Sequence, residues 1–239
     1  MLFGPPPASA PVVVFDLDGT LIDTAPDLVT TLNAIFAREN LPQVDYHSAR
    51  TMVGGGARMM IERGLKASGR TLPVTDTDRL VQEYIELYGA HIADRSRPFP
   101  GLEAALDKLT GAGFSLAVCT NKLEWLSVKL LGALGLLDRF SVVCGADTFG
   151  IPKPNAAILL GTIARAGGNP GHALMVGDSV TDIATARAAE VPVIAVDFGY
   201  TETPISEFNP DRIVGTFAEL PAAVFDLLGQ YLGQLKTRR

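Results

Sequence analysis

The chain of 239 residues is 47% hydrophobic and 19% charged, which is typical of a soluble globular protein with one or two domains and a sizeable core. Its formal net charge of −6 gives no general attraction for nucleic acid or for an anionic membrane surface, so any phosphate must be bound by local groups. No apolar run is long enough to cross a bilayer, and the N-terminus lacks the basic and apolar regions of a signal peptide.

Two cysteines, Cys119 and Cys144, are too few for a disulfide framework. Both end apolar runs, so we interpret them as small buried residues rather than as catalytic thiols. These features predict a cytoplasmic protein with no nucleic-acid partner and no membrane partner.

The first predicted strand carries two acids at its end. Residues 1–11, with three consecutive prolines, are expected to form a flexible lead-in. Residues 12–15 have the length and β-branching of a buried strand, and Asp16 follows directly. Asp18 comes two residues later, on the same face if the chain stays extended, and Gly19 then allows a tight turn. Two carboxylates this close together require a cation, a shared proton or water.

The next segment, residues 22–95, follows helical rather than strand periodicity. Asp23 or Thr24 is the predicted helix cap, and apolar residues then recur at helical spacing. Gly54-Gly55-Gly56 interrupts the helices without the Lys-Ser or Lys-Thr pair of a phosphate-binding P-loop; a flexible break and a substrate-facing loop both stay open. We find no convincing strand here and predict an all-α domain inserted after the first strand.

Strands and helices alternate from residue 96 onward. Such alternation with short links predicts a parallel sheet covered by helices, and therefore an α/β fold. The sheet domain is discontinuous in sequence and comprises residues 12–21 and 96–239. Its further strands are predicted at 114–119, 141–144, 173–176, 193–196 and 213–214, and its helices at 102–111, 124–134, 155–166, 181–189 and 217–235.

Polar residues follow three of the predicted strands, and a lysine precedes one of the helices. Because the carboxyl ends of parallel strands meet at one edge of a sheet, we expect these side chains to lie together. Clustered carboxylates without histidine or thiolate ligands suit a hard cation, of which Mg²⁺ is the first candidate. A lysine, a hydroxyl and turn amides suit a phosphate. The set therefore predicts metal-assisted phosphoryl transfer. Its members are Asp16, Asp18, Thr120, Asn121, Lys153, Asp178 and Asp182.

Four short motifs, in this order, resemble those of the haloacid dehalogenase-like superfamily. They are Asp16-Leu17-Asp18-Gly19-Thr20, Thr120-Asn121, Lys153-Pro154 and Gly177-Asp178-Ser179-Val180-Thr181-Asp182. The resemblance spans most of the chain, and the ordered set is more specific than the first motif alone. It implies a Rossmann-like three-layer core with an inserted helical cap domain at 22–95. Within that branch the chain most resembles the phosphoglycolate phosphatases, through Leu21-Ile22-Asp23-Thr24, residues 50–57 and Thr120-Asn121-Lys122.

The resemblance implies separate roles for the two acids of the first motif. Asp16 would be the nucleophile that forms an aspartyl-phosphate. Asp18 would be the general acid that protonates the leaving alkoxide and then the base that activates water. The founding dehalogenases lack the second aspartate, so its presence favours a phosphate ester over a carbon–halide bond as the substrate.

The resemblance also implies the ligands of a metal and of a phosphate. Mg²⁺ would be held by Asp16, the backbone carbonyl of Asp18 and Asp178, with Asp182 as a further candidate. The phosphoryl oxygens would be bound by Thr120, Asn121 and Lys153.

The implied activity is a Mg²⁺-dependent phosphomonoesterase, with 2-phosphoglycolate as the first expected substrate. A pyrophosphatase, a sugar phosphatase and a β-phosphoglucomutase-like phosphotransferase are the alternatives within the same chemistry. A binding module without turnover is disfavoured, because none of the key acids is missing and Lys153 is present. The expected partner is a small phosphorylated metabolite, and the protein is expected to be a monomer or a homodimer.

Three cations of the sequence are candidates to bind a carboxylate on the substrate. Arg50 and Arg58 lie in the inserted segment, and Lys122 follows the second motif. Surface cations are common, so an ordinary solvated side chain is the favoured interpretation of each, and the sequence does not choose among them.

Overall fold

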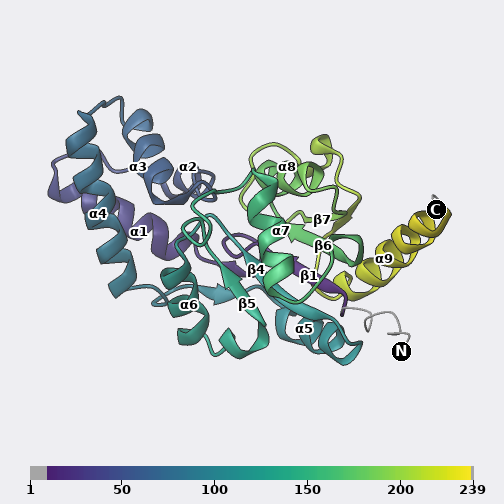
Figure 1. The fold of residues 1–239 in the computed structure, drawn as a ribbon. Coiled ribbons are helices and arrows are strands. Elements are labelled where there is room, and N and C mark those ends of the chain that lie inside the picture. Colours follow the sequence, from purple (N-terminus) through teal and green to yellow (C-terminus); the bar gives the residue numbers. More distant parts are fainter. Residues whose placement is uncertain (1–9, 238–239) are drawn as a thin grey trace.

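The structure, a computed structural model, describes the backbone of residues 10–237 and the side chains of residues 10–228. The lead-in expected at residues 1–11 lies outside this range except for its last two residues. Within the range the chain forms a six-stranded sheet, a pair of two-residue strands and nine α-helices (Figure 1).

The six-stranded sheet is wholly parallel, as the alternation of elements predicts. Its strands are β1 (Val12–Phe15), β4 (Ser115–Cys119), β5 (Val142–Cys144), β6 (Ala173–Gly177), β7 (Val193–Val196) and β8 (Arg212–Val214). They lie in the order β5-β4-β1-β6-β7-β8, so β1 is central. Phe15 pairs with Val118 on one side and with Val176 on the other, which brings three strand ends to one edge. Every residue of β1 is buried, because a strand covered on both faces has no polar side.

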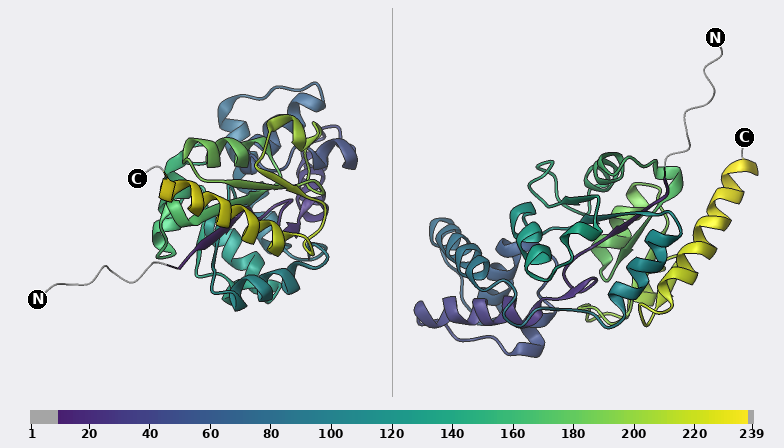
Figure 2. Two further views of the ribbon diagram at one scale, coloured as in Figure 1. Left: turned by 90° about the vertical axis from the view of Figure 1, so that its right-hand side faces the viewer. Right: turned by 90° about the horizontal axis from the view of Figure 1, so that it is seen from below.

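Helices cover both faces of the sheet and complete three layers (Figure 2). They are α5 (Leu102–Gly111), α6 (Glu124–Ala133), α7 (Ala156–Arg165), α8 (Val180–Ala188) and α9 (Leu220–Thr237). Val13 and Phe15 share a hydrophobic cluster with α5, α6 and α9. Val12 and Val14 pack instead with α7 and α8, as the alternation of side chains along a strand requires. The predicted α/β fold is therefore confirmed.

Four helices gather beyond the carboxyl ends of β1 and β4 (Figure 1). They are α1 (Ala25–Arg38), α2 (Tyr46–Arg50), α3 (Gly56–Ala67) and α4 (Val74–Ala90). Leu32 and Phe36 of α1, Ile61 of α3 and Tyr84 of α4 are buried among them. This apolar cluster is continuous with the one on the α5, α6 and α9 face of the sheet, so the helical block packs directly on the sheet domain.

One short element at the junction was not expected. Strand β2 (Ile22–Asp23) pairs antiparallel with β3 (Arg97–Pro98), where the sequence suggests no strand in residues 22–95. Two residues are too few to show a period of two, so only the pairing itself reveals the strand. The domain division at residues 22 and 95 stays a prediction, and this strand pair lies at its two boundaries.

Two smaller expectations concern thiols and membranes. Cys119 and Cys144 are both free and buried, at paired positions of β4 and β5, as the reading of small buried residues predicts. Among residues 10–237, no helix combines the length and the apolar composition that crossing a membrane requires.

Candidate active site

Asp16 lies directly after β1 and is almost fully buried. Its backbone N–H donates to the carbonyl of Val176, which continues the pairing of β1 with β6 by one residue. Its carboxylate Oδ1 lies 2.9 Å from Nζ of Lys153. This contact is an ion pair, and within the described residues Oδ1 accepts no hydrogen bond. A buried acceptor with a cation beside it but no hydrogen bond of good geometry calls for an explanation, and an ion bound at this position would provide one.

Gly19 makes room for the acid at the end of the neighbouring strand. It has a positive φ of 83°, and a Cβ placed on it would lie 2.4 Å from Oδ2 of Asp178. Any larger residue would therefore displace that carboxylate, which explains the glycine of the first motif. Asp178 itself accepts hydrogen bonds from Thr20 Oγ1 (3.0 Å) and from the backbone N–H of Tyr200 (2.9 Å).

Lys153 is buried between two carboxylates. In addition to its ion pair with Asp16, its ammonium donates to Oδ1 of Asp182 at 2.6 Å. The second oxygen of Asp182 accepts hydrogen bonds from the backbone N–H and the hydroxyl of Ser179, in a capping box at the start of α8. Both oxygens of Asp182 are thus engaged, and the acid fixes the position of the lysine relative to Asp16.

Asn121 joins the second motif to the third. Its side chain accepts a hydrogen bond from the Lys153 backbone N–H (2.9 Å) and donates to the Lys153 carbonyl (3.3 Å). It also lies 3.4 Å from the carbonyl of Gly54 in the helical block. Thr120, buried at the end of β4, accepts from the backbone N–H of Lys122. The Asn121 side chain therefore positions the loop that carries Lys153.

Asp18 has surroundings unlike those of Asp16. Oδ1 accepts a hydrogen bond from Thr24 Oγ1 at 2.7 Å, and Oδ2 lies 3.0 Å from Nζ of Lys122. Thr24 occupies the predicted N-cap position of α1 but makes no side-chain capping bond, because its hydroxyl is used on Asp18. Two acids of one motif are therefore held by different partners, which allows them different chemical roles.

Tyr200 is a site residue that the sequence does not reveal. Its backbone N–H holds Asp178, and its hydroxyl contacts the chain where α1 begins, accepting from Thr24 N–H and donating to Asp23. It follows β7 by four residues and belongs to no recognisable motif. The only signal in the sequence is its place after a strand that ends at the same edge of the sheet.

The buried acids form a group that suits a divalent cation. Oxygens of Asp16, Asp178 and Asp182 lie within 4.8 Å of one another. Burial raises the pKa of Asp16 to about 6 against the lowering effect of Lys153, and Asp182 and Asp18 add to the rise. Burial, then Asp182 and Asp16, raises the pKa of Asp178 to about 8. Burial and the neighbouring carboxylates therefore both disfavour the ionised acids, and an all-oxygen donor set fits a hard cation such as Mg²⁺.

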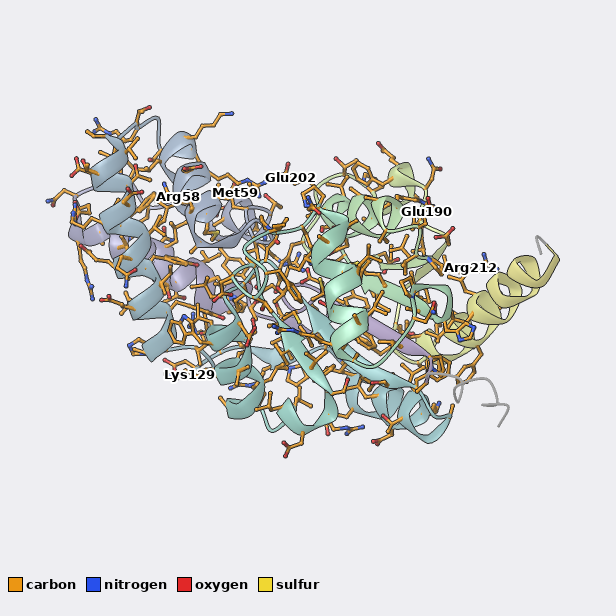
Figure 3. All side chains as sticks on the ribbon, viewed as in Figure 1. Arg58, Met59, Lys129, Glu190, Glu202 and Arg212 are labelled. Atoms are coloured by element: carbon orange, nitrogen blue, oxygen red, sulfur yellow. The ribbon has the colours of Figure 1, made fainter. Side chains whose placement is uncertain are left out.

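Two cavities meet at Asp18. The larger, of about 750 Å³, also contains Lys153 and Asp178 and opens between the sheet edge and the helical block. Met59 of α3 and Glu202, both labelled in Figure 3, are among the residues that line it. The smaller cavity, of about 230 Å³, extends from Asp18 between α3, α4 and α6. The site therefore offers a polar chamber at the sheet edge and a second, more apolar chamber behind Asp18.

Comparison with known proteins identifies the family. Residues 13–196 match the family described as haloacid dehalogenase-like hydrolase. This range includes every motif residue named above. The chain belongs to this family. The resemblance seen in the sequence is thereby confirmed, and the family is one of hydrolases.

Curated relatives and solved structures resemble this chain over most of its length. A phosphoglycolate phosphatase of Mesorhizobium japonicum is 47% identical over 220 residues, covering 92% of this chain and 97% of the relative. A phosphoglycolate phosphatase of Caulobacter vibrioides is 46% identical over 216 residues, covering 90% and 91%. A crystal structure of a predicted phosphoglycolate phosphatase from Haemophilus somnus has a TM-score of 0.81 at 30% identity, covering 88% and 96%. A predicted phosphatase from Clostridium acetobutylicum shares the fold, with a TM-score of 0.80 at 21% identity, covering 92% and 100%.

Proposed function

We propose that this chain is a Mg²⁺-dependent phosphomonoesterase that hydrolyses 2-phosphoglycolate to glycolate and phosphate through an aspartyl-phosphate. The observation that carries the proposal is the buried pairing of Asp16 with Lys153 beside Asp178, in a chain 47% identical to a phosphoglycolate phosphatase. The class of phosphoric monoester hydrolase follows from the family together with these relatives.

Asp16 is proposed as the nucleophile. A carboxylate oxygen attacks phosphorus, the bond from phosphorus to the ester oxygen breaks, and the phosphoryl group is carried on Asp16 until water releases it. A pKa of about 6 leaves this carboxylate mostly ionised at pH 7, as an attacking group must be. Lys153 offsets the negative charge of both the acid and the incoming phosphate.

Asp18 is proposed as the acid and base of the two steps. It gives its proton to the leaving alkoxide in the first step and takes one from the attacking water in the second. Its position supports this role, because it lies two residues after Asp16 in the chain and borders both cavities. Thr24 fixes one of its oxygens, which keeps the carboxyl oriented during the transfer.

The remaining motif residues are proposed to bind Mg²⁺ and phosphate. Asp16, the backbone carbonyl of Asp18 and Asp178 would hold the ion, which when bound supplies charge to reduce repulsion between nucleophile and phosphate. We assign Asp182 to positioning Lys153, because both of its oxygens already have donors. The phosphoryl oxygens would be bound by Thr120, Asn121 and Lys153.

Residues 22–95 are proposed to act as a cap over the site. Three contacts support this: Asn121 approaches Gly54, Thr51 Oγ1 donates to Glu202 at 2.8 Å, and Arg50 stacks on the ring of Tyr200 at 4.7 Å. Because Gly54 borders both cavities, the substrate-facing reading of the glycine run is favoured over a simple flexible break. Closure of such a cap excludes water from the reaction. A cytoplasmic location and a monomeric or homodimeric state are part of the same proposal.

A phosphate-release screen tests the proposal. Purified protein would be assayed with 2-phosphoglycolate, pyrophosphate, sugar phosphates and nucleotides, with Mg²⁺ and with EDTA. The expected result is Mg²⁺-dependent release with the highest kcat/KM for 2-phosphoglycolate. Equal kcat/KM values for all compounds would refute the substrate assignment, and release that persists fully in EDTA would refute the metal. Phosphate release without a sugar acceptor would exclude the phosphotransferase alternative.

A further inference from the structure

The cavity behind Asp18 is lined mainly by apolar and aromatic side chains. Leu28 of α1, Met60 of α3 and Leu126 of α6 contribute to its walls. Tyr84 and Tyr88 of α4 stack on one another with ring centroids 6.3 Å apart and an angle of 11° between their planes. A chamber of this kind excludes water, so any charge inside it acts strongly on a bound ligand.

One buried cation stands at the Asp18 end of this cavity. The Lys122 side chain is 5% exposed, and its Nζ lies 3.0 Å from Asp18 Oδ2. The same Nζ donates to the Tyr88 hydroxyl at 3.2 Å and lies 4.4 Å from the centroid of the Tyr88 ring. An ammonium group has three donors. Among the described residues two acceptors lie within hydrogen-bonding distance of it, which leaves a donor for a ligand in the cavity it lines.

The two other cations suggested by the sequence are engaged elsewhere. Arg50 stacks on Tyr200 and donates to the carbonyl of Phe198. It is not among the residues that line either cavity. Arg58, labelled in Figure 3, borders the smaller cavity, but its side chain is 50% exposed and pairs with acids of the helical block. Lys122 is the one of the three that is both buried and next to Asp18.

The proposed chemistry fixes where a leaving group must lie. Its ester oxygen has to meet Asp18, while the phosphoryl group stays on the side of Asp16 and Lys153. The rest of the leaving group then extends past Asp18 into the smaller cavity. A carboxylate one carbon away from that ester oxygen comes alongside Lys122, because the ammonium lies only 3.0 Å from the Asp18 carboxylate.

We propose that Lys122 selects phosphate monoesters whose leaving group carries a carboxylate on the carbon next to the ester oxygen, by binding that carboxylate in the smaller cavity. The inference rests on the proposed phosphatase function and adds the residue that recognises the leaving group. Tyr88 orients the ammonium from the helical block. Thr24 keeps its bond to Asp18 when Lys122 turns toward the substrate, so the acid retains a partner. An uncharged leaving group gains nothing from the lysine.

The test compares 2-phosphoglycolate with its amide, which replaces the carboxylate by an uncharged group of the same shape. The measured quantity is the ratio of kcat/KM for the acid to that for the amide. For the wild-type protein this ratio is expected to be at least about 10, because a hydrogen bond between charged groups is lost with the amide. A wild-type ratio near one would overturn the proposal without need of any variant.

The variant Lys122→Met is expected to lower the same ratio about 10- to 100-fold, and Lys122→Arg to retain part of it. Lys129→Met is the matched control. Lys129 of α6, labelled in Figure 3, also contacts the end of α4, by donating to the carbonyl of Gly89. It is not among the residues that line the cavity, so the ratio should not change. If Lys122 only positions Asp18, Lys122→Met will slow both substrates equally and leave the ratio unchanged, which would overturn the proposal.

The outcomes separate this proposal from the proposed function. If the wild-type protein hydrolyses 2-phosphoglycolate but Lys122→Met keeps the wild-type ratio, only the role of Lys122 fails. If another 2-phosphooxy acid is preferred and its own acid-to-amide ratio falls in Lys122→Met, the lysine is supported and the 2-phosphoglycolate assignment fails. If only esters without a carboxylate are hydrolysed, or none is, the selection by Lys122 is refuted.

Discussion

Replacing Tyr200 by phenylalanine is expected to destabilise the start of α1 while leaving the carboxylates of the site in place. The hydroxyl accepts hydrogen bonds from the backbone N–H groups of Thr24 (2.7 Å) and Ala25 (3.0 Å), and it donates to Asp23 Oδ1 (2.7 Å). The first N–H groups of a helix have no carbonyl partner within the helix, so this hydroxyl satisfies them from a loop far away in the sequence. The aromatic ring and the backbone N–H that holds Asp178 are unchanged by the substitution.

The size of the effect follows from burial. Tyr200 is 3% exposed, and leaving a buried donor without a partner costs about 1–3 kcal/mol. Two such donors with partial relaxation lower the free energy of unfolding by about 2–4 kcal/mol. In a chain of this length about 1 kcal/mol corresponds to about 2 °C in Tm, so Tyr200→Phe is expected to melt about 4–8 °C below the wild-type protein.

Thermal unfolding followed by circular dichroism, at one fixed Mg²⁺ concentration, measures this difference. Tyr46→Phe is the matched control, because Tyr46 lies on α2 with 39% of its surface exposed. Its Tm is expected within about 1 °C of the wild-type value. A Tyr200→Phe protein that also melts within about 1 °C of wild type would refute the argument that the hydroxyl holds the beginning of α1.

Three further predictions concern the acidic group. Gly19→Ala is expected to lower kcat/KM about 100-fold, since its Cβ displaces Asp178; an unchanged value would contradict the steric argument. Lys153→Met is expected to lower the free energy of unfolding by about 3–5 kcal/mol in urea titrations, because Asp16 and Asp182 lose their buried cation; a smaller change at pH 7 than at pH 4 would contradict this. The pKa values of Asp16 and Asp178, about 6 and about 8, are raised above that of an unfolded aspartate. Without metal, the contribution of these two groups to the free energy of unfolding is therefore greatest below about pH 4 and is lost as the pH rises toward 8. The rise in Tm on adding Mg²⁺ is therefore expected to be larger at pH 8 than at pH 5.5, and the reverse order would refute the site.

Local patterns were sufficient to predict most of the sheet. Each predicted strand lies within a residue of its observed bounds, because a buried parallel strand is a continuous apolar run whose length is visible in the sequence. The last helix begins at Leu220 rather than at residue 217. The difference has a local cause: Glu219 accepts from Thr216 Oγ1 and from the Gly215 N–H, which forms a turn before the helix starts.

Contacts between distant segments could not be predicted in the same way. Tyr200 meets Thr24 across 176 residues, and no spacing rule connects them. Two further hydrogen bonds likewise depend on how loops meet at the sheet edge. One joins the Asn121 side chain to Lys153, and the other joins Thr24 to Asp18. The motifs indicate which residue types gather there, whereas the structure shows which partner each one takes.

The most direct test of the central claim is the rate of phosphate release from 2-phosphoglycolate by the wild-type protein and by Asp16→Asn, measured side by side with saturating Mg²⁺. Asparagine preserves the shape of the side chain but cannot form a stable bond to phosphorus in the attacking role. We expect kcat to fall by at least about 10³-fold in a variant that remains folded. An Asp16→Asn protein that retains the wild-type rate would contradict the assignment of Asp16 as the nucleophile.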